Sequence, residues 1–397
     1  MTKTRETAAA FLDRRSMLAM IGAGAVTAPL AAVSARTPKP KPKPKRPLGQ
    51  WRDAVIVNAL GGLSNPNVEN DGGIDPVRRI DARTIADARA SGLSAVNVTM
   101  GYVSGGMEPF EYSVRTIAGW DRLIRDHPAD LVKILGVGDI VRAKAEGRIG
   151  IIYGFQNAVM MGDKADRADI FADLGVRIIQ LTYNPANTIG DGSMARENRR
   201  LTPFGRAVVE RLNANRVMVD LSHSGERTCL EAARVSKQPI SINHTGCRAL
   251  TDLPRNKTDA ELRLVAERGG FVGIYFMPFL DISGHARADH VVAHIEHAVN
   301  VCGEDHVGIG TDGGTTQIDD MEAYKARLAQ EVERRRAAGI GATGERADTF
   351  PFVIDLRGPT QFHDLADRLR KRGHSTARIE KILGQNFLRY GREIWGS

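Results

Sequence analysis

Short apolar runs rich in β-branched residues alternate along this chain with longer segments of helical periodicity. This alternation predicts repeated βα units and a parallel sheet. The predicted strands span residues 54–60, 94–100, 150–155, 177–182, 217–221, 239–243, 271–275 and 306–311. A parallel sheet of this length closes readily and then has no exposed edge, so we expect an α/β fold, a (β/α)8 TIM barrel. The charged segment 319–355 is predicted to be an insertion after the last strand.

Two of the predicted strands end in a histidine. VDLSH at 219–223 ends in His223, and ISINH at 240–244 ends in His244. Residues at the carboxyl ends of the strands of such a barrel face its mouth, where active sites are found. Either imidazole alone is equally compatible with a strand-end histidine that bonds a loop carbonyl. As a pair on successive strands they indicate a shared site, and zinc is the metal that such imidazoles commonly bind.

The net charge of +8 lies entirely in the first 47 of the 397 residues. That segment carries ten Lys and Arg against only Glu6 and Asp13, so the acidic and basic side chains of residues 48–397 balance. A nucleic-acid-binding domain needs a basic face on its folded body, so we expect no nucleic-acid partner. The three cysteines have no CxxC spacing, which excludes a disulfide framework.

The basic amino-terminal segment resembles an export signal. Arg14 and Arg15 precede the apolar, small-residue run 17–26, and residues 33–35 offer a cleavage site. We therefore predict a twin-arginine-type signal peptide over 1–35, a Pro/Lys-rich linker over 36–47 and a single domain over 48–397. The expected location is periplasmic or otherwise exported, with the twin-arginine export machinery as a partner and no stable membrane span in the mature form.

Further polar residues follow the predicted strands at the barrel mouth. Gln156 follows the third strand, Tyr183 follows the fourth and Asp312 follows the eighth. A carboxylate beside metal-binding imidazoles is a good general base, although Asp312 is also typical of a turn before two glycines. Arg255 lies in the loop after His244 and is able to grip a substrate carboxylate or simply to brace the loop.

Several motifs in order resemble the signatures of the membrane (renal-type) dipeptidase family, peptidase M19, over most of residues 54–390. They are GVRIIQLTYN at 175–184, LTPFG at 201–205, VDLSHS at 219–224, HTGCRAL at 244–250, PRN at 254–256 and HVGIGTD at 306–312. The resemblance implies an amidohydrolase-like metallo-dependent hydrolase barrel with two bridged zinc ions. It also implies cleavage of dipeptides, including those with a D-residue at the carboxyl end.

The sequence departs from the family pattern at the first zinc ion. The family's His-x-Asp pair on the first strand aligns with Leu60 and Gly62, neither of which binds metal. The bridging glutamate is replaced by Gln156, and the substrate-binding histidine by Tyr183. The family's ligands of the second zinc ion are matched by His223 and His244. Its catalytic aspartate is matched by Asp312, and its substrate-carboxylate arginine by Arg255.

Three hypotheses for the function of the site follow from this pattern. The first is an exported hydrolase of dipeptides or related small amides with a free carboxylate, which holds one zinc ion on His223, His244 and Gln156. In it Asp312 and Tyr183 are catalytic, and Arg255 and Tyr183 bind the substrate. The second is a metal-free enzyme of another class on the same barrel, and the third is a non-catalytic binding protein for peptides or cell-wall fragments. A homodimer is the commonest assembly for such enzymes.

Overall fold

The computed structural model describes residues 51–68 and 80–396. Their strands form one sheet in the order β1-β2-β4-β5-β6-β7-β8-β9, and every neighbouring pair is parallel. The strands are β1 (Ile56–Gly61), β2 (Leu93–Thr99), β3 (Leu131–Lys133), β4 (Ile149–Phe155), β5 (Val176–Gln180), β6 (Met218–Asp220), β7 (Ser241–Thr245), β8 (Phe271–Ile274) and β9 (Val307–Ile309). All eight predicted strands are present. The sequence did not reveal β3, which pairs with the first residues of β4.

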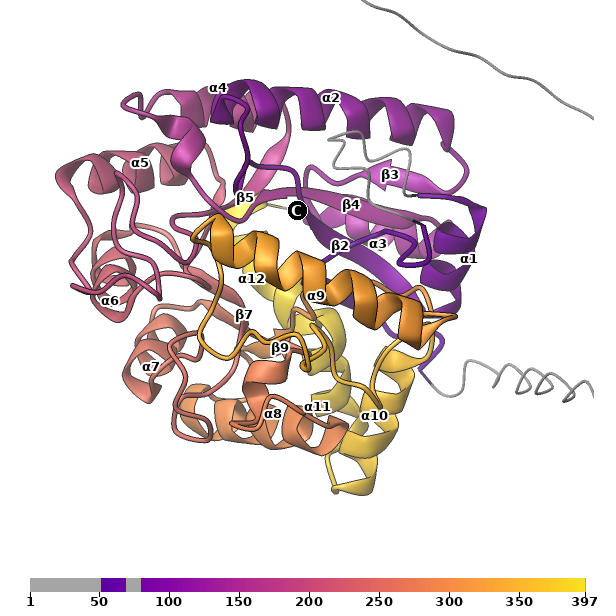
Figure 1. The fold of residues 1–397 in the computed structure, drawn as a ribbon. Helices are drawn as coiled ribbons and strands as arrows, with labels where there is room; N and C mark the ends of the chain where they lie inside the picture. The colour runs from indigo at the N-terminus through magenta and orange to yellow at the C-terminus, as the bar shows by residue number, and fades with distance from the viewer. Residues whose placement is uncertain (1–50, 69–79, 397) are drawn as a thin grey trace, which may run out of the picture. The chain divides into compact units, whose positions relative to one another are not determined.

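Helices alternate with these strands, as the periodicity predicted (Figure 1). The α-helices are α1 (Ala82–Ala90), α2 (Pro109–Asp126), α3 (Val137–Ala145), α4 (Arg167–Asp173), α5 (Pro203–Ala214), α6 (Glu226–Val235), α7 (Asp259–Glu267), α8 (Ala288–Cys302), α9 (Met321–Ala337), α10 (Gln361–Lys371), α11 (Thr376–Glu380) and α12 (Asn386–Trp395). None of the helices in the described ranges is both long and apolar enough to cross a membrane. The predicted signal peptide and the whole of the predicted linker fall on residues that the structure does not describe.

The first and last strands meet through loop and side-chain hydrogen bonds. The Asp312 amide donates to the Leu60 carbonyl at 2.9 Å, and the Gly62 amide donates to the Gly313 carbonyl at 3.2 Å. The Asn58 side chain accepts from the Thr311 amide at 2.8 Å. These bonds nearly close the parallel sheet into a barrel, and they bring Asp312 to its mouth.

The opposite end of the barrel is filled by aromatic side chains of α12. Phe387 packs edge-on against Phe271 of β8 with ring centroids 5.4 Å apart, and Tyr390 stacks on the same ring at 6.1 Å. All three side chains are buried. The apolar packing therefore lies at the amino-terminal ends of the strands, which leaves the carboxyl ends for polar groups.

A buried carboxylate ties β6 to β7 directly beneath the two histidines. Asp220 accepts hydrogen bonds from the Ser222 amide, the Ser222 hydroxyl and the Asn243 amide at 3.0, 2.5 and 3.0 Å. The Ser222 hydroxyl in turn accepts from the His244 amide at 3.0 Å. This network fixes the backbone that carries both imidazoles and thereby sets the distance between them.

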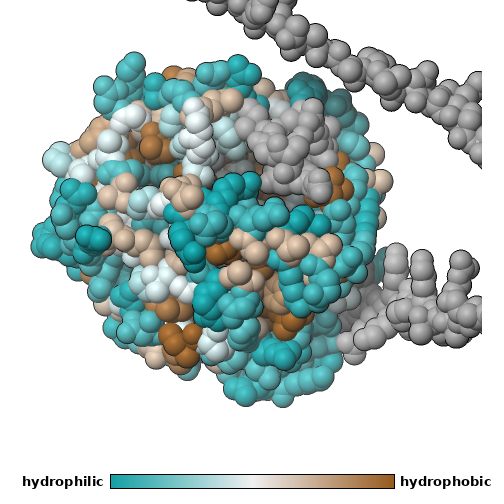
Figure 2. Space-filling model, in the orientation of Figure 1, coloured by the Kyte–Doolittle hydropathy of each residue, from teal (hydrophilic) through white to brown (hydrophobic). Residues whose placement is uncertain are grey.

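The predicted insertion after the last strand forms α9 and the loops around it. Figure 1 shows α9 lying in front of the barrel, and its residues line the same cavities as the strand ends. Figure 2 shows a mostly hydrophilic surface over this face, with small apolar patches. The insertion therefore covers part of the barrel mouth.

Candidate functional site

His223 lies at the centre of the mouth and has a defined hydrogen-bonding state. Its Nδ1 lies 2.7 Å from Asn184 Oδ1, while the Asn184 amide group donates to the Ile340 carbonyl at 2.8 Å. Because Asn184 thus presents its oxygen to the ring, His223 Nδ1 carries the proton and Nε2 is left as an acceptor. The structure therefore assigns a single tautomer to this imidazole.

His244 lies behind His223 at the end of β7. The two Nε2 atoms are 3.0 Å apart, and within the described ranges His244 Nδ1 has no hydrogen-bond partner. Burial lowers the pKa of both imidazoles well below 6.5, and the nearby Arg255 cation lowers it further. Both rings are therefore neutral at physiological pH.

Arg255 is the cation closest to the histidine pair. Only 2% of the residue is exposed. Its Nη1 donates to the Ser222 carbonyl at 2.7 Å, and its Nη2 lies 3.1 Å from His223 Nε2, to which it donates. A guanidinium has five N–H groups, so these contacts leave others free. Because Arg255 also lines the mouth cavity, its free N–H groups are available to an anionic ligand.

Tyr183 covers the outer face of His223. The two rings stack with centroids 4.3 Å apart and an interplanar angle of 21°. The Tyr183 hydroxyl accepts from both terminal nitrogens of Arg335 at 3.3 Å, and Arg335 is itself paired with Glu345 at 2.7 Å. Burial raises the pKa of Tyr183, so the hydroxyl keeps its proton and can donate it to a ligand carbonyl.

Asp312 follows β9 and has an unusual backbone conformation. Its φ is +56°, in the left-handed region that non-glycine residues rarely adopt, and such strain is common at functional sites. Gln156 donates to its Oδ1 at 3.4 Å. Burial raises the pKa of Asp312 to about 6, while Arg255 and Arg335 oppose the rise. The carboxyl group is therefore ionised at neutral pH but accepts a proton readily.

A cavity of about 250 Å³ brings these side chains together. The predicted residues Tyr183, His223, Arg255 and Asp312 all line it, whereas His244 and Gln156 do not. Its other walls are Asn184, Met277, Pro278, Phe279, Leu328, Glu331, Val332, Arg335, Ala342, Glu345, Arg346, Thr349 and Pro351. The sequence did not reveal that the insertion lines this cavity, because a charge-rich helix is typical of a solvated surface.

The metal-binding potential of the mouth depends on the free lone pairs of His223 and His244. A zinc ion binds each imidazole nitrogen at about 2.0 Å and therefore needs both lone pairs. Here Arg255 donates to His223 Nε2 at 3.1 Å, so this lone pair already accepts a hydrogen bond from a cation. These contacts disfavour a metal on the histidine pair.

The other predicted ligands do not complete a metal site. Leu60 lies in β1 and Gly62 follows it, and neither side chain offers a metal ligand. The Gln156 amide group donates to Asp312. Within residues 51–68 and 80–396, no group of three or more His, Cys, Asp or Glu side chains could hold a metal ion. The residues present do not fit the two-zinc centre that the resemblance implies. They also disfavour the single zinc ion predicted on His223, His244 and Gln156.

Comparison with known proteins gives the family of the chain. The family model described as membrane dipeptidase, peptidase family M19, matches residues 100–340. The chain belongs to this family. The resemblance drawn from the motifs is therefore confirmed, and so is the amidohydrolase-like barrel. Family membership supports the prediction of a dipeptidase-like hydrolase.

Two curated sequences and two solved structures illustrate the similarity. The dipeptidase tcpJ of Claviceps purpurea is 28% identical over 69% of this chain, but the match spans only 56% of that protein. An uncharacterised Klebsiella pneumoniae protein encoded in the pqqA 5′ region is 28% identical over 58% of this chain and 90% of its own length. An amidohydrolase from Pseudomonas aeruginosa is 31% identical, with a TM-score of 0.72, over 87% of this chain and 98% of its own. A Rhodobacter sphaeroides metallopeptidase liganded with a phosphinate mimic of L-Ala-D-Ala shares the fold, with a TM-score of 0.67. It is 19% identical, and the match covers 86% of this chain and 99% of that protein.

A buried ion pair lies next to the site, where the loss of one charge would affect the stability of the fold. Lys257 and Glu261 lie 3.0 Å apart, and each side chain is only 2% exposed. Lys257 also donates to the Ser224 carbonyl, next to His223. We expect Lys257→Met to lower the free energy of unfolding by about 3–5 kcal/mol, because it leaves the Glu261 carboxylate buried without a counter-charge.

Urea unfolding of the single and double variants checks this prediction. The double variant Lys257→Met/Glu261→Gln removes both charges and should recover most of the lost stability. A double variant that is as unstable as the sum of the two single variants would contradict the proposed coupling.

Proposed function

We propose that this protein is an exported hydrolase of dipeptides or related small amides with a free carboxylate. The observation that carries the proposal is the shared cavity, in which a buried arginine, a protonated tyrosine hydroxyl and a carboxyl group of raised pKa face one ligand volume. Apolar walls from Met277, Phe279 and Val332 suit the side chains of a small peptide. Membership of a dipeptidase family supports the same substrate class.

The proposed chemistry uses this chain's own residues. Free N–H groups of Arg255 bind the carboxylate of the substrate and orient the amide. The Asp312 carboxylate takes a proton from water as the water oxygen bonds to the amide carbonyl carbon. The Tyr183 hydroxyl donates a hydrogen bond to the developing oxyanion, supported by Arg335. Asp312 then returns the proton to the departing amine as the C–N bond breaks.

A second candidate function is binding without hydrolysis. The contact that favours it is the 3.1 Å hydrogen bond from Arg255 to His223, because it engages the nitrogen that metal chemistry in this family would need. In this case the cavity would retain a peptide or a cell-wall fragment with a free carboxylate. Ligand binding and product formation must therefore be measured separately.

Chromatographic product analysis with a panel of L,L- and L,D-dipeptides tests the proposal. Wild type should release free amino acids, and Arg255→Gln should lower kcat/KM at least tenfold, since a charge-assisted pair contributes about 1.5–3 kcal/mol. The matched control Arg263→Gln changes an exposed arginine of α7 and should leave kcat/KM unchanged. Binding of the dipeptides without product would favour the second candidate, and neither binding nor product would contradict both.

The pKa of Asp312 predicts the pH dependence of hydrolysis. Because the base is active only when ionised and its pKa is about 6, kcat/KM should be constant above pH 7. Below pH 6 it should fall about tenfold per pH unit as the carboxylate is protonated. Asp312→Asn should abolish product formation, and a profile with no limb near pH 6 would contradict the role of Asp312 as the base.

Export is the second part of the proposal, and the amino-terminal sequence supports it. We expect the mature protein in the periplasmic fraction with its amino terminus just after Ala35, and retention in the cytoplasm when Arg14 and Arg15 are both changed to Lys. Fractionation with amino-terminal sequencing checks both outcomes. A periplasmic protein that retains Met1 would show that no signal peptide is cleaved.

A further inference from the structure

A second cavity of about 210 Å³ lies beside the mouth cavity. Asp312 and Pro351 line both, so the two cavities flank the same carboxyl group. Helix α9 spans them, because its first turn contributes Tyr324 to the second cavity and its later turns contribute Arg335 to the first. A ligand whose amide lies at Asp312 can therefore extend into both.

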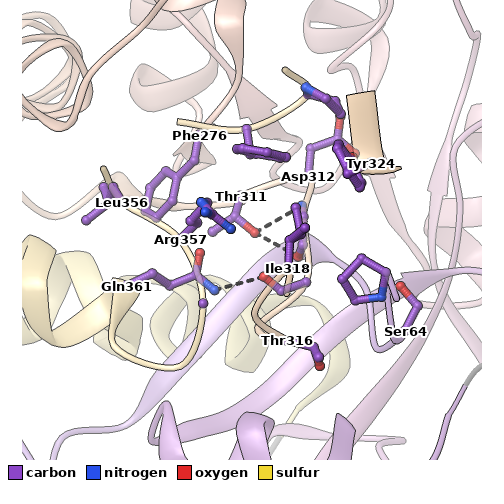
Figure 3. A pocket seen from close by; sticks show the side chains of 16 residues that line it. Ser64, Phe276, Thr311, Asp312, Thr316, Ile318, Tyr324, Leu356, Arg357 and Gln361 are labelled. Carbon is purple, nitrogen blue, oxygen red and sulfur yellow. Dashed lines mark hydrogen bonds between the residues drawn. The ribbon is translucent and has the colours of Figure 1, made fainter. Parts of the chain in front are cut away.

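The second cavity combines apolar walls with one arginine (Figure 3). Phe276, Tyr324, Phe352 and Leu356 supply the apolar surface. The Arg357 guanidinium lies over the Phe352 ring at 5.3 Å from its centre, and its Nε donates to the Ile354 carbonyl at 3.3 Å. Among the described residues no carboxylate forms an ion pair with Arg357, so its terminal nitrogens are available to a ligand.

A buried hydroxyl in the same wall also lacks a partner. Thr316 lines the cavity and is only 7% exposed, yet its Oγ1 has no hydrogen-bond partner in the described part of the chain. A buried polar group without a partner is costly, and a ligand oxygen would satisfy it. Burial lowers the pKa of Arg357, which agrees with the absence of a neighbouring carboxylate in the described ranges.

We propose that this cavity is the subsite for the acyl half of the substrate, and that it selects an acyl group with a second carboxylate on a short apolar stem. The proposal rests on the proposed function, which places the other carboxylate of the substrate at Arg255. Arg357 forms the charge-assisted hydrogen bonds, Thr316 donates one more, and the aromatic walls cover the methylene groups of the stem. The substrate class is therefore a dipeptide or related amide with an acidic amino-terminal half.

The test compares Glu-Ala with its neutral isostere Gln-Ala. Wild type should hydrolyse Glu-Ala with at least a tenfold higher kcat/KM, and Arg357→Gln should remove this preference while Gln-Ala hydrolysis persists. Thr316→Val should reduce the preference by a smaller factor and keeps the test available if Arg357→Gln does not fold. The control Arg263→Gln should keep the wild-type preference. Equal rates on the two dipeptides, or a preference that survives Arg357→Gln, would overturn the proposal.

Calorimetric titration separates this proposal from the proposed function. Both dipeptides are titrated into Asp312→Asn, in which hydrolysis does not consume the ligand, and into wild type if it forms no product. Tighter binding of Glu-Ala that is lost in Arg357→Gln would support the subsite even if wild type hydrolyses neither dipeptide. Equal affinities for the two dipeptides would overturn the subsite even if wild type hydrolyses both.

Discussion

The hydrogen bond from buried Arg255 to His223 organises the mouth of this barrel. It can form only because Asn184 holds the imidazole in the tautomer that leaves Nε2 as an acceptor. Burial keeps both histidines neutral, and the nearby Arg255 cation adds to this effect while it stabilises the Asp312 carboxylate against the cost of burial. Positive charge at this mouth is therefore supplied by arginine side chains, of which Arg255 matches an arginine of the family pattern.

The barrel holds these groups in place through hydrogen bonds between two pairs of strands. Between β6 and β7, the Asp220 carboxylate binds backbone amides on both sides and fixes the spacing of the histidines. Between β9 and β1, the amide of Asp312 donates to Leu60, and the strained backbone aims its carboxyl group into the mouth. The insertion adds Arg335 from outside the barrel, so the site depends on a segment that is not part of the βα repeat.

The sequence predicted the barrel because strand length, β-branched composition and helical periodicity are local properties. It also predicted that Tyr183, His223, Arg255 and Asp312 share one cavity, because parallel strands all end at the same face. It did not reveal β3, whose three residues are too short for a periodic signal, nor the roles of Arg335 and Arg357. Arg335 lies in the charged insertion and Arg357 just after it, and only the tertiary path of these segments places the two side chains in the cavities that Asp312 lines. The contact of Gln156 with Asp312 likewise depends on side-chain geometry that spacing does not encode.

The claim that Arg255 engages His223 and disfavours a metal on the histidine pair is tested most directly by the zinc content of the protein. The chain should be purified without chelators, dialysed against zinc-free buffer and measured by mass spectrometry beside His223→Ala. The account predicts fewer than about 0.1 zinc ions per chain in both proteins, because two neutral imidazoles facing a guanidinium are a poor zinc site. About one or two zinc ions per wild-type chain, lost in His223→Ala, would contradict it.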